Sequence, residues 1–278
     1  MAERAVETIV TGQPTSDGAG VRLTRFIGTP ALEHVDPFLL LDEFKSDRAG
    51  DYVGGFPDHP HRGFETVTYM LAGAMEHRDH VGNRGELVAG SVQWMTAGRG
   101  IVHSEMPRQT DGLLWGFQLW VNLPARDKMT PPRYQDIAPD RIPEVVLGEG
   151  ARARLIAGEA AGQKGPVDGI ATRPLYLDVR LAPTARVPLD VPAGHSAFVC
   201  VYVGRVRVGE RTLTAGQLGV LGEGDRLTVN AGGEEARFLL VAGQPLHEPI
   251  ARYGPFVMNT RAEILQAVED YQRGTLAR

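Results

Sequence analysis

Two pairs of potential metal ligands stand out in the sequence, and the members of each pair lie two residues apart. His59 and His61 are separated by one proline, and His103 and Glu105 by one serine. Side chains at positions i and i+2 of a strand leave the same face, about 6.6 Å apart. Two such strands facing each other across a barrel would bring three imidazoles and one carboxylate to one point. This donor set suits a divalent transition metal and leaves one or two coordination positions for water or substrate.

One His-x-His pair alone is weak evidence, because the chain contains eight histidines in 278 residues and short histidine clusters usually have no metal. The second pair strengthens the case. It follows the glycine-rich run TAGRG at residues 96–100, which would turn a strand back toward the first pair. The two pairs together predict a bound metal.

Composition places the chain among globular proteins long enough for one large or two ordinary domains. The net charge of −5, the pI of about 5.9 and the lack of a long basic run argue against direct binding to nucleic acid. Cys200 is the single cysteine and lies in an apolar run, so we interpret it as a buried structural thiol. No apolar signal region or membrane-length apolar run occurs, so we expect a cytoplasmic protein without a membrane segment.

The elements that position the ligand pairs are expected to be strands. Short runs with period-two alternation, separated by the 34 glycines and 19 prolines, predict an all-β architecture. In the first half, strands are expected at residues 6–10, 21–27, 38–44, 64–73, 86–89, 91–96, 101–106 and 113–122. In the second half, they are expected at residues 153–157, 175–181, 197–208, 217–221, 226–230 and 236–242. Because Pro60 cannot donate to a ladder, its strand should lie at a sheet edge or contain a bulge.

A proline-rich stretch separates two β-rich halves of similar length. Residues 123–143 contain five prolines and little periodicity, so we interpret them as a crossover. The second half lacks a His-x-His pair, and only the first half is predicted to bind a metal. A capping box formed by Thr260 and Glu263 starts one convincing helix, Gly274 ends it, and the helix is expected to pack on a barrel.

The segments around the ligand pairs resemble the pirin family. The similarity is carried by HPHRGFETVTY, QWMTAGRGIVHSEMP, QLWVNL and YQ, at residues 59–69, 93–107, 118–123 and 134–135. It covers essentially the whole chain. It implies a bicupin of two tandem β-barrel (double-stranded β-helix) domains with a short C-terminal helix. Residues 1–135 would form the metal-binding cupin, and residues 136–278 a degenerate cupin with the helix.

The resemblance implies that His59, His61, His103 and Glu105 bind one divalent transition metal. Cupins more commonly draw their carboxylate from the first motif, where Glu65 has the required spacing. The pirin pattern uses the glutamate after the third histidine, so Glu65 is assigned a supporting or structural role. The donor set admits Fe, Ni, Co, Mn, Cu or Zn, and we favour Fe(II).

One departure from the family pattern is His80, where many relatives carry a small polar residue. We interpret it as an exposed turn histidine, and the alternative is a polar group near the mouth of the pocket.

The resemblance implies a metal-dependent quercetin 2,3-dioxygenase, which opens a flavonol with O2 and releases carbon monoxide. Glu105 would be both ligand and catalytic base for the flavonol 3-hydroxyl, with Glu65 or a water as substitutes. Several aromatic and apolar residues are candidates for the walls of a pocket for a flat substrate. Because side chains alternate between the two faces of a strand, only some of them can point into the pocket. These candidates are Phe56, Pro57, Phe64, Trp94, Met95, Phe117 and Trp120.

The alternative function is a metal-containing, redox-responsive regulatory protein that acts through a protein partner. The acidic pI favours a protein partner over DNA. A cupin isomerase or a metal-storage protein is a third interpretation, and the lone open site without cysteine clusters argues against storage. The resemblance also implies a monomer. The sequence alone identifies neither the metal nor the physiological substrate.

Overall fold

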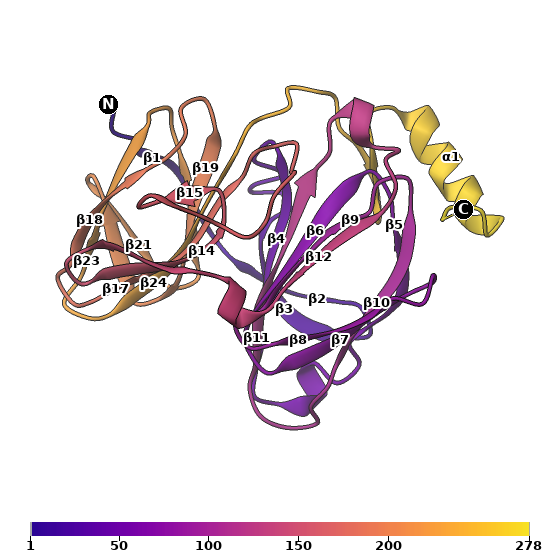
Figure 1. Cartoon of the computed structure of the whole chain (residues 1–278), viewed down its shortest axis with the longest axis horizontal. Coiled ribbons are helices and arrows are strands. Elements are labelled where there is room, and N and C mark those ends of the chain that lie inside the picture. The colour runs from indigo at the N-terminus through magenta and orange to yellow at the C-terminus, as the bar shows by residue number, and fades with distance from the viewer. Residues whose placement is uncertain (1, 278) are drawn as a thin grey trace. The chain divides into compact units, whose positions relative to one another are not determined.

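The computed structural model describes residues 2–277, so Met1 and Arg278, at the outer ends of the two predicted domains, lie outside the described residues. Within this range the chain is built from strands β1 to β26, with three short 3-10 helices and the helix α1 near the C-terminus (Figure 1). This architecture confirms the predicted all-β fold class. Among the described residues, no helix is long and apolar enough to cross a membrane.

The chain forms two compact units that exchange their terminal segments. Within the described residues, unit 1 comprises the stretch up to Gln13, Gly28–Pro37 and Asp140–Pro245. Unit 2 comprises Pro14–Ile27, Phe38–Pro139 and the stretch from Leu246 onward. The main switch after Pro139 lies close to the predicted boundary between residues 135 and 136. At both ends, however, the units depart from the predicted division into 1–135 and 136–278.

Unit 2 is built on two antiparallel sheets. The larger sheet has the strand order β12-β9-β6-β11-β4-β3-β2, and the smaller sheet has the order β5-β10-β7-β8. In the same order, the strands of the larger sheet are Arg133–Ile137, Val92–Thr96, Phe64–Ala72, Leu114–Asn122, Phe38–Ser46, Val21–Ile27 and Gln13–Asp17. Those of the smaller sheet are Phe56–His61, Ile101–Pro107, Ala74–Asp79 and Arg84–Val88. The 3-10 helices Ala49–Asp51 and Ala125–Asp127 lie in this unit, and the 3-10 helix Pro139–Arg141 spans the switch from unit 2 to unit 1.

The sequence analysis missed several strands of unit 2, among them β2 and two strands that lie nearer the ligand pairs. One is β12, which lies inside the proline-rich segment that we expected to be only a crossover. It is a short strand at the edge of the larger sheet and pairs with β9 alone. Its side chains are exposed or half-buried, so the sequence shows little alternation of apolar and polar residues there. The other is β7, which lies between β10 and β8 and brings His77 into the interior.

Unit 1 repeats the two-sheet plan. Its larger sheet has the order β1-β22-β19-β24-β17-β14-β13, and its smaller sheet has the order β18-β23-β20-β21. The strands of the larger sheet are Val6–Thr11, Gln217–Leu221, Ser196–Val203, Ala236–Gly243, Leu175–Leu181, Ala151–Ala157 and Glu144–Gly148. Those of the smaller sheet are Arg186–Asp190, Arg226–Ala231, Arg205–Val208 and Arg211–Thr214, and a two-stranded hairpin joins Glu159–Ala160 to Gln163–Lys164. Because β1 pairs with β22, the N-terminal strand belongs with the second half of the chain.

The C-terminal segment belongs to the unit that contains the ligand pairs. It forms the hairpin of β25 (Ala251–Tyr253) and β26 (Phe256–Met258) and then α1 (Arg261–Gln272). The predicted capping box of Thr260 and Glu263 is present. Apolar residues of the helix pack against the hairpin and the last described residues, through Phe256, Met258, Ile264, Ala267 and Leu276.

Arg62 fastens this segment to the strand that contains the first histidine pair. Its side chain is buried and follows directly after β5. Nη1 donates to Asp270 of the helix at 2.7 Å, and Nη2 donates to the carbonyl of Leu276 at 3.1 Å. Nε donates to the carbonyl of Arg99 in the turn that precedes the second ligand pair. One guanidinium therefore joins the helix to both ligand-bearing segments.

Lys128 makes a second buried connection within unit 2. Its side chain is 1% exposed, and burial lowers the pKa of its ammonium to about 8. Nζ donates to the carbonyls of Gly63 and Val257 at 2.8 and 3.0 Å and to the amide oxygen of Asn122 at 2.7 Å. The ammonium therefore joins the turn after the first histidine pair to the C-terminal hairpin.

We expect Lys128→Met to destabilise the protein by about 2–4 kcal/mol, because three buried oxygen atoms would lose their donor. The free energy of unfolding in urea measures the change. Lys164→Met, the same substitution at an exposed lysine, is the control and should shift stability by less than about 0.5 kcal/mol. Equal stabilities of the two variants would contradict this role of Lys128.

Candidate metal centre

The two ligand pairs lie on neighbouring antiparallel strands. In the ladder between β5 and β10, His59 is directly opposite His103, and His61 is opposite Ile101. One ring nitrogen each from His59, His61 and His103 lies within 4.8 Å of the other two. Strand β5 is at the edge of its sheet, as the proline between its two histidines predicted. The structure therefore brings together the three histidines that the sequence selected.

Burial keeps the imidazoles of His61 and His103 neutral. His61 and His103 are 3% and 1% exposed. Burial, with a smaller contribution from neighbouring histidines, lowers the pKa of both residues well below the usual value. Neutral imidazoles keep a lone pair on one nitrogen, and this is the form that binds a transition metal.

Hydrogen bonds indicate which nitrogens are available to an ion. Nδ1 of His59 lies 2.8 Å from the carbonyl of Pro57 and must donate to it, so Nε2 is the ring nitrogen that can offer a lone pair to an ion. That Nε2 is 3.1 Å from Nε2 of His61. Nε2 of His103 is buried and has no hydrogen-bond partner among the described residues. A cation bound by Nε2 of each of the three histidines would give every one of these nitrogens a partner, so the residues fit a transition-metal ion.

Glu105 lies beside the histidines but is held by other groups. A register shift in the β5–β10 ladder separates it from His103. Its buried carboxylate accepts hydrogen bonds from Thr68 at 2.8 Å and from Gln118 at 3.1 Å. It lines the same cavity as His59 and His61. The assignment of Glu105 as fourth ligand and base stays a prediction.

Glu65 lies among structural partners. Its carboxylate accepts hydrogen bonds from Trp94 at 3.1 Å and from Thr96 at 2.6 Å, and it does not line the cavity. Burial raises its pKa to about 7. The structural role assigned to it from the sequence agrees with this environment.

A cavity of about 380 Å³ opens beside the histidines. Three of the predicted wall residues line it, namely Phe56, Pro57 and Trp120. The other four do not line it and are buried in the core: Phe64, Trp94, Met95 and Phe117. The sequence analysis missed the apolar wall residues of β3 and β4, which are Leu23, Leu40 and Phe44.

The cavity is bordered by two arginines. Arg25 forms two hydrogen bonds to Asp42, at 2.8 and 2.7 Å, so its charge is compensated. Arg252, from the C-terminal hairpin, lies 4.8 Å from the ring centre of Trp120 in a cation–π contact. The C-terminal segment therefore supplies part of the wall of the histidine-lined cavity.

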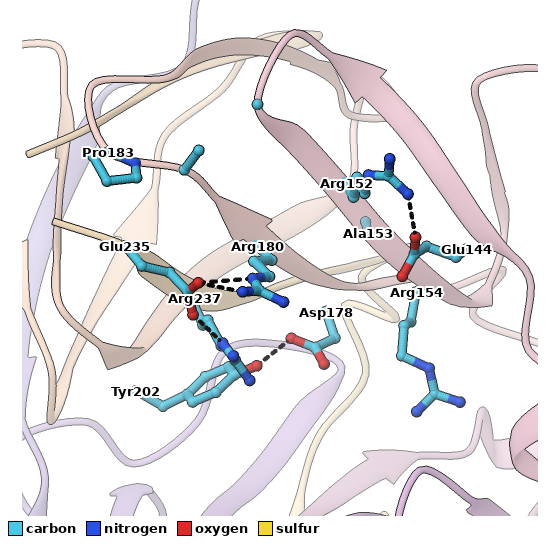
Figure 2. A pocket seen from close by; sticks show the side chains of 12 residues that line it. Glu144, Arg152, Ala153, Arg154, Asp178, Arg180, Pro183, Tyr202, Glu235 and Arg237 are labelled. Atoms are coloured by element: carbon cyan, nitrogen blue, oxygen red, sulfur yellow. Dashed lines mark hydrogen bonds and ion pairs between the residues drawn. The ribbon is translucent and has the colours of Figure 1, made fainter.

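A larger cavity in unit 1, of about 540 Å³, has a different character (Figure 2). Its described lining contains no histidine, and it is dominated by ion pairs. Arg152 pairs with Glu144 at 2.8 Å, and Arg180 and Arg237 both pair with Glu235 at 2.8 Å (Figure 2). These arginines are matched by carboxylates, so the metal centre of unit 2 remains the stronger candidate for chemistry.

Two cupin-type β-units, one of which has a three-histidine cluster able to bind a metal, define the molecule as a bicupin. Family models confirm the class: the Pirin model matches residues 20–121, and the Pirin C-terminal cupin domain model matches residues 176–277. The chain belongs to the pirin family.

Relatives of this family match the chain over almost its whole length. A Pseudomonas aeruginosa protein provisionally named a quercetin 2,3-dioxygenase is 51% identical and covers 99% of this chain and 98% of its own. Pirin from Homo sapiens is 44% identical, over 98% of this chain and 93% of its own. The crystal structure of quercetin 2,3-dioxygenase from Acinetobacter baumannii is 38% identical, covers 99% of both chains and has a TM-score of 0.91.

We expect the protein to bind one equivalent of Co(II) or Ni(II). The His103→Ala variant should bind the metal more than about 100-fold more weakly, because the loss of an outer-shell partner already costs about 10- to 100-fold and His103 would be a direct ligand. Competition with a chelator measures the affinity. His34→Ala, at an exposed histidine, is the matched control and should bind like the parent. Parent-like binding by His103→Ala would contradict the assignment.

Glu65 should make the metal-free protein less stable as the pH rises from about 4.5 to about 7. Its pKa is raised in the folded state to about 7, so the folded state holds the proton more tightly than the unfolded state does. This contribution is present below pH 4.5 and lost through that window, by about 3 kcal/mol. The free energy of unfolding in urea is measured across pH for Glu65→Gln and for the parent. The difference between the two curves of free energy against pH gives the contribution of Glu65. Parallel curves would contradict the prediction.

Proposed function

We propose that this protein is a metal-dependent dioxygenase that cleaves a flavonol such as quercetin with O2. The observation that carries the proposal is the convergence of His59, His61 and His103 beside a cavity with a flat aromatic wall. The relatives from P. aeruginosa and A. baumannii, whose names specify quercetin 2,3-dioxygenase, support the same activity. Fe(II) is the occupant that we favour, and the donor set also admits Ni, Co, Mn, Cu and Zn.

His59, His61 and His103 would hold the metal, with Glu105 as the proposed fourth ligand. When bound, the metal lowers the pKa of a coordinated hydroxyl and provides a site for reaction with O2. The three imidazoles and one carboxylate contribute a single negative charge, so the loaded centre keeps a net positive charge. This charge favours the deprotonated form of the substrate.

Glu105 would remove the proton of the flavonol 3-hydroxyl. In this step the O–H bond breaks, the proton moves to a carboxylate oxygen of Glu105, and the electron pair stays on the flavonol oxygen. Thr68 and Gln118 hold the carboxylate from both sides, so its orientation is fixed before the substrate arrives. The two donors are neutral, and they leave lone pairs of the carboxylate free to accept the proton.

Trp120 is a proposed wall for the flat substrate, and Arg252 lies over its ring. Its ring is held by Phe64 at a centroid distance of 4.4 Å and by His61 at 5.3 Å, so it is rigid and adjacent to the metal centre. Phe56 and Pro57 provide further apolar surface in the same cavity. These walls would orient the ring system and exclude water from the reacting oxygen.

We expect Glu105→Gln to reduce the rate of quercetin cleavage by about 100-fold or more while the protein still binds metal, because the amide cannot accept the proton. Oxygen uptake and metal content are measured on the same sample. Glu43→Gln is the control, since this glutamate lies in the same unit, is partly buried and does not line the cavity. A metal-loaded Glu105→Gln protein as fast as the parent would contradict the role of Glu105 as base.

The second candidate function is redox-responsive regulation through a protein partner. Because it would use the same metal centre, the two functions are distinguished by whether the metal-loaded protein cleaves a flavonol. A protein that binds stoichiometric metal, cleaves no flavonol and co-purifies with a partner in only one oxidation state would favour regulation.

A further inference from the structure

His77 is a buried histidine that lies against the metal centre and was not selected from the sequence. It is on β7, directly opposite Glu105 in the β7–β10 ladder, and its side chain is 2% exposed. Its Nδ1 lies 3.4 Å from Nδ1 of His103, and the centres of the two rings are 5.1 Å apart. His77 therefore meets His103 at Nδ1, the ring nitrogen opposite the unpartnered Nε2.

The protonation of these two rings is linked. Nδ1 of His103 is engaged with His77, so the buried and unpartnered Nε2 is the nitrogen left for a metal. A neutral imidazole that gives its Nε2 lone pair to a metal must have its proton on Nδ1. That Nδ1–H then points at His77, whose Nδ1 must be unprotonated to accept it.

We propose that His77 is a positioning residue that fixes the tautomer and ring orientation of His103 for metal binding. The inference rests on the proposed metal site and deepens it. Metal-bound histidines depend on an acceptor for their second ring nitrogen, and loss of that acceptor costs about 10- to 100-fold in metal affinity. Carboxylates or carbonyls usually supply the acceptor. Here it is a second imidazole.

The surroundings of His77 hold it in place for this task. The ring of Tyr134 packs edge-on against it, with centroids 5.0 Å apart and an interplanar angle of 66°. The hydroxyl of Tyr134 donates to Asp79, two residues after His77, at 2.9 Å. The tyrosine therefore packs against the His77 ring and is itself anchored to the same strand. The cluster of ring nitrogens able to hold an ion consists of His59, His61 and His103, so His77 acts through His103.

The test compares His77→Asn with His77→Phe. Asparagine keeps an oxygen acceptor close to the position of Nδ1, whereas phenylalanine fills the ring volume without an acceptor. The matched control is His80→Phe, three residues along the chain at an exposed position. Co(II) affinity is measured by chelator competition, and the visible spectrum of bound Co(II) reports the ligand geometry.

We expect His77→Phe to bind Co(II) about 10- to 100-fold more weakly than the parent, with an altered visible spectrum. His77→Asn should retain most of the affinity and the parent spectrum. In Zn(II)-loaded protein, nitrogen NMR should show the His103 proton on Nδ1 in both the parent and His77→Asn. A merely structural role would lower the melting temperature of the metal-free protein and would not be rescued by asparagine.

His77→Leu provides a second acceptor-free variant in case His77→Phe does not fold, and the same loss is expected. Parent-like affinity and spectrum in a folded acceptor-free variant would overturn this inference and leave the metal site intact. Failure of the parent itself to bind Co(II) would overturn the proposed metal site, and the inference with it.

Discussion

The pairing of β5 with β10 is the constraint on which the rest of the site depends. It places His59 opposite His103, and the two-residue spacing then adds His61 on the same side. A slip of one residue would turn these side chains to the other face of the sheet. The same two-residue spacing on β10 follows His103 with Glu105, whose carboxylate accepts hydrogen bonds from Thr68 and Gln118.

This edge-strand register is supported by groups from distant parts of the chain. Arg62 lies in the turn that follows β5, and Lys128 donates to Gly63 of that turn. Each joins the turn to the C-terminal segment of the same unit. Because such buried cations are costly to desolvate, each is compensated by several acceptors. The C-terminal segment belongs to the unit that contains the histidine cluster. It stabilises the first ligand strand and contributes Arg252 to the cavity wall.

Most of the centre could be predicted because it depends on local patterns. The i, i+2 spacing selected all three clustered histidines, the proline predicted an edge strand, and the capping box predicted α1. The residues that could not be predicted depend on pairing between strands that are distant in the sequence. His77 becomes part of the centre only because β7 pairs with β10, and the alternation of a single strand does not reveal its partner. The same limit applies to the walls, since Phe117 alternates as regularly as Trp120 but lies on the covered face of β11.

The central claim is that the histidine centre and its cavity form a flavonol dioxygenase. The most direct test is oxygen uptake on quercetin by protein stripped of metal and reloaded separately with Fe(II), Ni(II), Co(II), Mn(II) and Cu(II). We predict turnover with one or two of these metals, abolished in the metal-free protein and in His61→Ala. Stoichiometric loading without turnover for every metal would contradict the claim.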